Sequence, residues 1–219
     1  MADRLNLTNL LLSCGAAAGP LFVAVFSVEG AVREGYDARR EPVSALALGD
    51  RGWVQRANFI GSGGLMLACA AGLRRAWPDA RWSPRLVAAF ATGLVGAGVF
   101  VTDPPARPSD GPAVVAPNVQ GALHNAFSIV VFGALAGACG AVAVRFAKIG
   151  QEAWAAYSAL CGLTVVVGVG IFGRAFSNAK FGGVGGAVQR GTIVVGWGWL
   201  SMLAVRLLRG HPGDGTLTR

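Results

Sequence analysis

The chain has 219 residues, of which 53% are hydrophobic and only 14% are charged, and its mean hydropathy is +0.53. Soluble domains are about a quarter charged, so this composition excludes an ordinary soluble protein and indicates a bundle of apolar membrane helices. The net charge of +8 comes from basic residues scattered at the ends of apolar segments, without the basic stripe that nucleic-acid-binding proteins carry. We therefore predict no nucleic-acid partner and attribute the charge to membrane topology and anionic headgroups.

Six segments are long and apolar enough to cross a bilayer, which takes about 20 residues and about 17 at the short end. The predicted fold is an all-α, six-transmembrane-helix bundle that forms a single domain over residues 1–210, followed by a flexible tail at 211–219. We interpret the first segment as an uncleaved helix, because it continues well past Cys14 and only Arg4 supplies a basic region before it. The predicted spans cover about 5–28, 54–73, 86–102, 121–144, 154–172 and 188–208.

Six crossings place both termini on one side of the membrane, together with the short connectors 74–85 and 145–152. Both connectors carry arginine or lysine, so the positive-inside rule predicts that this side is cytoplasmic. Arginines of the first connector, among them Arg51 and Arg56, oppose this rule, and we expect a function to keep them on the other side.

One tripeptide recurs at the start of two predicted spans. Val, Gln and Arg occupy positions 54–56 at the second span and positions 188–190 at the sixth. Three repeated helical hairpins would explain the recurrence, since transporters are often built from internal repeats. Coincidence would explain it equally well, because the match is only three residues long.

The first, third and fifth connectors share one face of a six-span protein, and most polar residues of the chain fall there. The second, fourth and sixth spans begin on this face, so their free N–H groups and positive dipole ends point toward it. With arginines at two of these helix starts, the pattern predicts a polar pocket for an anionic group. The alternative is that the arginines pair internally or reach lipid headgroups. The residues expected to bind the ligand are Arg56, Gln55, Asn58, Asp37, Ser44, Asn125, Gln189, Arg190 and Arg174.

Acid–base chemistry is a second hypothesis for the same face. His124 begins the fourth span, and Asp103 ends the third across a proline-rich loop. If the two side chains touch, the carboxylate orients the imidazole and raises its proton affinity, and Glu29 is a further candidate catalytic group. The alternative is that His124 makes a hydrogen bond that closes the hairpin. One histidine and one aspartate are too few for a metal site, so we predict neither a metal nor a cofactor.

Two segments of the first polar region, 41–46 (EPVSAL) and 52–58 (GWVQRAN), resemble the bacterial integral membrane family labelled domain of unknown function 998. The residues at 102–104 and 121–125, with Trp154 and Tyr157 at the fifth span, fit the same family. The resemblance extends over nearly the whole chain. It implies a six-span protein of the bacterial inner membrane, and it implies no activity.

Three functions compete at this stage. The first is binding or transport of a lipid-like or small anionic ligand in a polar pocket on the outward face. The second is an enzyme embedded in the membrane that acts on a lipid or isoprenoid, and the third is an accessory or structural subunit that docks a partner protein. Membrane lipids are expected partners in every case, and a protein partner or a homo-oligomer is left open. An interior without charged rings argues against a wide ion channel.

Overall fold

The computed structural model describes residues 2–104, 118–177 and 183–210, so the tail predicted at 211–219 lies outside the described part. Within it, the chain forms six α-helices and one short 3-10 helix and contains no strand, which confirms the all-α prediction. The elements are α1 (Ala2–Val32), η1 (Val43–Ala47), α2 (Gly52–Ala76), α3 (Ser83–Val99), α4 (Val119–Lys148), α5 (Glu152–Ser177) and α6 (Gly185–Arg209).

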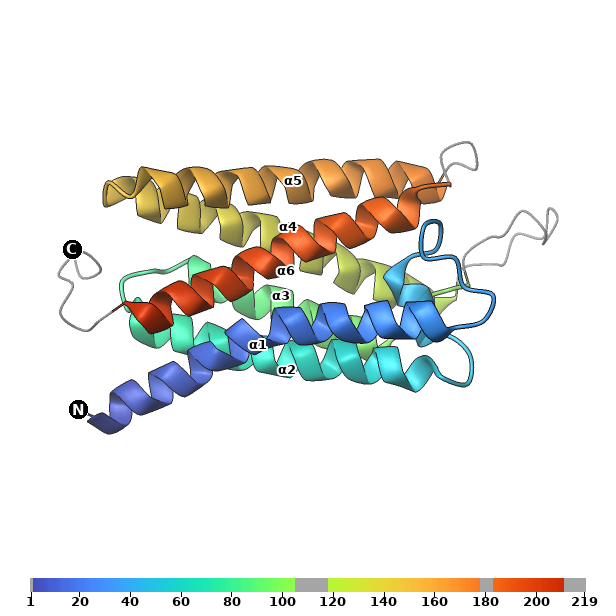
Figure 1. Cartoon of the computed structure of the whole chain (residues 1–219), viewed down its shortest axis with the longest axis horizontal. Coiled ribbons are helices and arrows are strands. Elements are labelled where there is room, and N and C mark those ends of the chain that lie inside the picture. Colours follow the sequence, from blue (N-terminus) through green and yellow to red (C-terminus); the bar gives the residue numbers. More distant parts are fainter. Residues whose placement is uncertain (1, 105–117, 178–182, 211–219) are drawn as a thin grey trace.

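Each helix runs opposite to the one before it (Figure 1). The last turns of α1, α3 and α5 therefore lie at the same end of the bundle as the first turns of α2, α4 and α6, and we call this the connector end. The opposite end, where α1 begins and α6 finishes, we call the terminal end. The connector end thus gathers the polar segments that the sequence analysis assigned to one face.

Each helix contains one predicted span and extends past it, except α3. That helix stops at Val99, whereas the predicted span continued to Thr102. The chain turns into an extended conformation at Phe100, and Pro104 follows, a residue that disfavours helical backbone before it. The third span was therefore placed slightly too far along the chain.

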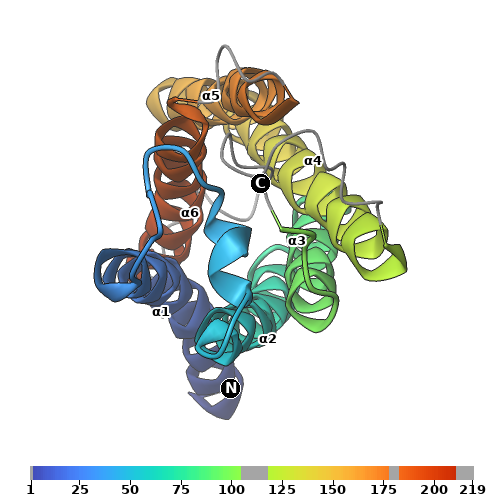
Figure 2. The ribbon, with the colours of Figure 1, turned by 90° about the vertical axis from the view of Figure 1, so that its right-hand side faces the viewer.

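Seen along its long axis, the bundle is a closed ring (Figure 2). Every helix packs against its neighbours in sequence, and α6 returns to pack against α1. Glycines allow the closest approaches: a methyl group at Gly96 on α3 would overlap with the Phe127 ring on α4. Small residues are favoured at such contacts because no hydrophobic driving force associates helices in lipid. Close van der Waals packing between the helices therefore stabilises the bundle.

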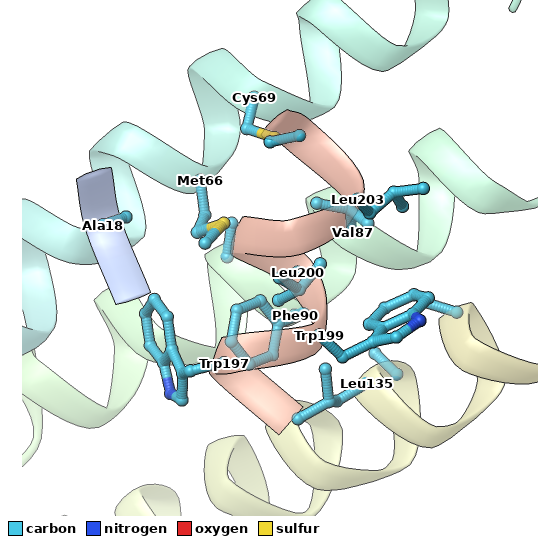
Figure 3. Close-up of a cluster of buried hydrophobic side chains, with 14 of the residues drawn as sticks. Ala18, Met66, Cys69, Val87, Phe90, Leu135, Trp197, Trp199, Leu200 and Leu203 are labelled. Atoms are coloured by element: carbon cyan, nitrogen blue, oxygen red, sulfur yellow. The ribbon is translucent and has the colours of Figure 1, made fainter. Parts of the chain in front are cut away.

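Large side chains fill the ring from its middle toward the terminal end (Figure 3). Trp197 on α6 stacks on Phe22 of α1 with ring centroids 4.6 Å apart and meets Phe90 of α3 edge-on at 5.2 Å. Leu200 and Leu203 continue this packing along α6 and are each 1% exposed. Tightly packed apolar side chains therefore close the interior between Trp197 and the terminal end.

The outer surface is suited to lipid. Large apolar residues point outward on α4 and α5, such as Ile129 with 74% and Leu160 with 63% of their surface exposed. Four helices are long and apolar enough to cross a membrane by length and composition, namely α4, α5, α6 and the Asn6–Val32 part of α1. Apolar surface of this extent is stable only against a lipid environment, so the fold is that of a helical membrane protein.

Candidate functional site

The ring encloses a cavity of about 1640 Å³ at the connector end. Its floor is formed at mid-bundle by Phe90, Leu135 and Trp197, and its walls include Phe132 of α4 and Phe172 of α5. Polar side chains line it only around the mouth, and we call this set the rim. The rim residues are Asp37, Arg40, Glu41, Ser44, Thr102, Asp103, His124, Asn125, Ser128, Ser177 and Gln189.

One side of the cavity faces the membrane. Helices α4 and α5 meet near the terminal end and diverge toward the connector end (Figure 1). Several residues between them line the cavity and have large exposed fractions, as expected at an opening, among them Ile129 at 74%, Val166 at 58% and Phe176 at 40%. The cavity is thus continuous with the lipid-facing surface through this α4–α5 opening.

The segment 36–48, which contains η1, lies across the connector end of the ring (Figure 2). Val43 and Leu46 are 2% and 0% exposed, so the segment is packed into the bundle rather than lying on it. The Gln189 side-chain oxygen accepts a hydrogen bond from the Val43 N–H at 2.8 Å. Ser44, which the sequence predicted to bind the ligand, is the second residue of η1 and lines the cavity.

Arg190 fastens this segment to α6. Its Nη1 donates to the carbonyl oxygens of Ala38 at 2.6 Å and Glu41 at 3.0 Å, and its Nη2 donates to the Tyr36 hydroxyl. Burial raises the pKa of Tyr36, which keeps the phenol neutral, and the hydroxyl donates in turn to the Pro42 carbonyl at 3.0 Å. The start of α6 therefore binds carbonyl groups of its own chain where the sequence predicted an external anion, and Arg190 does not line the cavity.

Glu29 is held by two arginines and does not line the cavity. Its carboxylate is 3% exposed and accepts hydrogen bonds from Arg33 at 2.8 and 3.2 Å and from Arg51 at 2.8 and 3.0 Å. Arg33 also donates to the carbonyls of Leu46 at 3.1 Å and Leu48 at 2.7 Å. This group ties the end of α1 to the segment that carries η1.

Gln55 and Asn58 lie on the buried face of α2, against α1. The Asn58 side-chain amide donates to the Phe22 carbonyl at 3.1 Å and to the Gln55 side-chain oxygen at 3.3 Å. The Gln55 Nε2 is buried and has no hydrogen-bond partner among the described residues. Neither side chain lines the cavity, and their polar groups join two helices.

Arg56 and Arg174 also lie outside the cavity. The Arg56 Nε donates to the Gly98 carbonyl at 3.2 Å and so connects α2 to the end of α3. Arg174 is exposed on the last turn of α5. No arginine predicted to bind the ligand is therefore part of the cavity wall.

His124 and Asp103 both line the cavity, but they do not pair. The His124 Nδ1 lies 3.0 Å from the Ala97 carbonyl and 2.9 Å from the Phe100 carbonyl. Because both partners are acceptors, Nδ1 carries a proton, and in the neutral tautomer this leaves Nε2 as an acceptor. The Asp103 carboxylate instead accepts a hydrogen bond from the Asn118 side chain. The His124 imidazole thus joins the start of α4 to the end of α3, which is the alternative role raised for it from the sequence.

The second nitrogen of His124 remains available to a ligand. The side chain is 3% exposed and lines the cavity, and no described residue hydrogen-bonds to its Nε2. Asp103 lies beside the first turn of α4, where a Cβ at Gly121 would overlap with the carboxylate. Among the described residues, no cluster of three His, Cys, Asp or Glu side chains could hold a metal ion.

The structure brings half of the predicted site residues to the cavity. Those that line it are Asp37, Ser44, Asp103, His124, Asn125 and Gln189, and those that do not are Glu29, Gln55, Arg56, Asn58, Arg174 and Arg190. Sequence reasoning missed the whole apolar wall and five rim residues, namely Arg40, Glu41, Thr102, Ser128 and Ser177. Phe132 and Phe172 resemble ordinary core residues in the sequence; the available signal was a glycine following each, Gly133 and Gly173, both of which line the cavity.

A closed ring of helices with a lipid-facing exterior and an internal cavity defines the class, a helical membrane protein. The model of the family described as "Protein of unknown function (DUF998)" matches residues 16–206, and the chain belongs to this family. No curated protein and no solved structure matches the chain. The matched region extends from α1 to α6, so the cavity lies within the part of the chain that defines the family.

Proposed function

We propose that this protein binds a lipid-like amphiphile, with the apolar chain between α4 and α5 and the headgroup at the rim. The observation that carries the proposal is the distribution of polarity in the cavity, which is polar at the connector end and apolar from there to Trp197. Its volume of about 1640 Å³ exceeds the range of about 300–1,000 Å³ common for small-molecule sites. A long molecule with one polar end matches both features.

The α4–α5 opening supplies a path from the membrane. An acyl or isoprenoid chain that slides between Ile129 and Val166 stays in an apolar environment throughout. Its headgroup stays at the level of the helix ends, where the rim lies. Access of this kind avoids the cost of moving the chain through water, about 0.8 kcal/mol for each buried CH₂ group.

Binding is favoured over the other functions raised from the sequence. Transport across the bundle needs a path from Trp197 to the terminal end, but Leu200 and Leu203 are buried in the packed core there. An anionic small solute needs free cationic groups, but Arg56 and Arg190 donate to carbonyl oxygens outside the cavity. An enzyme that uses His124 as a base is the second candidate, favoured because the side chain lines the cavity and no described residue hydrogen-bonds to its Nε2.

We also propose that all six helices cross the bacterial inner membrane with both termini in the cytoplasm. α3 has 17 residues, which is enough for a short span, and the polar groups of α2 are buried against α1. The proposal of three repeated hairpins is supported by Arg56 and Arg190, since each lies in the first turns of its helix and donates to a backbone carbonyl. Labelling of single cysteines at Asp37 and Arg81 tests the topology, which predicts that they react from opposite sides.

Native mass spectrometry of the gently extracted protein, with Gly133→Trp as the variant, tests the binding proposal. Gly133 lines the cavity and has no atom within 4 Å of a Cβ built on it, so an indole there narrows the α4–α5 opening without a backbone clash. Gly140 is the matched control, because it is equally exposed on α4, has equally open surroundings and does not line the cavity.

We expect co-purified lipid on the wild-type chain and on Gly140→Trp, and loss of most of it from Gly133→Trp. If Gly133→Trp retains as much lipid as Gly140→Trp, the cavity is not the binding site. A wild-type chain that retains no lipid when extracted from bilayers would also overturn the proposal.

A further inference from the structure

We infer that the headgroup bound at the rim carries a protonated amine that donates hydrogen bonds. This inference rests on the proposed function and names the ligand class for the same cavity. It comes from two independent features of the rim, its charge and the protonation pattern of one buried side chain.

One carboxylate of the rim has no cationic partner among the described residues. The described residues that line the cavity include the carboxylates of Asp37 and Asp103 beside a single guanidinium, that of Arg40. Arg40 lies 3.3 Å from Asp37, and both are largely exposed, so these two charges offset each other. Asp103 forms no ion pair with any described residue, and its carboxylate accepts a hydrogen bond from the neutral amide of Asn118. A cationic group of a ligand at this position would provide the countercharge for the Asp103 carboxylate.

His124 adds an acceptor at the same part of the rim. Its Nδ1–H is committed to the Ala97 and Phe100 carbonyls, so the neutral ring offers the cavity a lone pair on Nε2. The side chain is 3% exposed and lines the cavity, so a headgroup bound at the rim can satisfy this nitrogen. An ammonium group offers three donors, whereas a phosphate or carboxylate group offers acceptors that repel the lone pair.

The arginines that could reverse this preference are engaged elsewhere. Arg190 donates to the Ala38 and Glu41 carbonyls, Arg56 donates to the Gly98 carbonyl, and Arg51 binds Glu29. None of these three lines the cavity. An anionic headgroup would therefore meet acceptors and carboxylates at the rim, with Arg40 as the only cation among the described lining residues.

Competition among three phospholipids with identical acyl chains tests the inference. The full-length protein is equilibrated with phosphatidylethanolamine, phosphatidylcholine and phosphatidylglycerol in equal amounts, and the bound species are resolved by native mass spectrometry. The first has a cation with N–H donors, the second a cation without them, and the third a net negative charge. We expect the ethanolamine lipid to be bound about tenfold more than each of the others, a ratio within reach of one hydrogen bond to a charged group.

Two variants isolate the rim groups. Asp103→Asn removes the charge and keeps the acceptor for Asn118, and His124→Asn keeps a donor near the position of Nδ1 and removes Nε2. Each should reduce the preference for the ethanolamine lipid severalfold while the amount of total bound lipid changes less. Asp79→Asn, at the terminal end, is the control and should leave the preference unchanged.

Equal binding of the three lipids, or a preference for the glycerol lipid, would overturn the inference. So would an ethanolamine preference that both Asp103→Asn and His124→Asn leave intact. These results are separable from failure of the proposed function. If the wild-type chain binds the three lipids equally and Gly133→Trp removes them, the cavity binds lipid and only the headgroup assignment is wrong. If Gly133→Trp removes none of the three lipids, the proposal that the cavity is the lipid-binding site is refuted.

Discussion

Glu29→Gln tests whether one buried carboxylate holds the connector end together. Glu29 accepts four hydrogen bonds from Arg33 and Arg51, at 2.8 to 3.2 Å, and is 3% exposed. Arg33 also donates hydrogen bonds to the Leu46 and Leu48 carbonyls, which belong to the segment 36–48 across the connector end. An amide at position 29 keeps the shape of the side chain but removes the charge, and with its oxygen in the place of Oε1 it directs N–H donors at the Arg51 guanidinium.

The expected loss of stability follows from the exposure of the two arginines. Removing one partner of a buried ion pair costs about 3–5 kcal/mol, because the other charge is left buried without compensation. The Arg51 side chain is 59% exposed and can be hydrated in the variant, whereas that of Arg33 is only 17% exposed. We therefore expect the lower end, about 3 kcal/mol. For a chain of this size, about 2–4 °C per kcal/mol converts this loss into a fall in Tm of about 6–12 °C.

The buried cysteines provide the assay. Cys69 and Cys139 are 1% and 0% exposed, so a thiol-reactive fluorescent dye labels them only when the helices separate. Asp37→Asn is the matched control, since it makes the same chemical change in an ion pair whose side chains are 48% and 63% exposed. That pair is worth at most about 1 kcal/mol.

If Glu29→Gln unfolds within the range of Asp37→Asn, the buried cluster does not stabilise the connector end and the reasoning is refuted. Well below its Tm, Glu29→Gln should still bind the same lipids as the wild-type chain. A selective loss of ligand turnover with unchanged Tm would instead return Glu29 to the catalytic role considered from the sequence.

Two further predictions concern packing and pH. Gly96→Ala should lower Tm, since overpacking against the Phe127 ring costs about 1–3 kcal/mol, whereas Gly140→Ala in open surroundings should be neutral or stabilising; equal Tm values for the two would contradict the packing described for α3 and α4. A hydrogen bond from Arg145 lowers the pKa of Asp79, so this pair stabilises the fold above the ordinary pKa of aspartate, about 3.9, and the contribution disappears as the pH falls through the lowered value. Asp79 is 69% exposed, so the Tm difference between the wild-type chain and Asp79→Asn should be small at pH 7 and vanish under acid, and a difference that grows under acid would count against the pair.

Much of the fold could be predicted because it depends on properties that are local in the sequence. Long apolar runs define the helices, and consecutive helices that each cross a bilayer run in opposite directions, so the first, third and fifth connectors had to gather at one end. His124 and Asp103 could be assigned to that end for the same reason. The stop of α3 at Val99 escaped prediction because the apolar run continues through Phe100 and Val101, past the last helical residue.

What a side chain does at that end was decided by contacts between residues far apart in the sequence. The sequence around Arg190 does not distinguish an arginine that binds an external anion from one that donates to carbonyls of its own chain. Only the folded segment 36–48 brings the Ala38 and Glu41 carbonyl oxygens within 2.6 and 3.0 Å of the Arg190 Nη1. The cavity itself arises because α4 diverges from α5 while α6 closes the ring onto α1. Hydropathy along the chain records how apolar each helix is, but the angle between two helices depends on how their side chains interlock, which is a property of the tertiary structure alone.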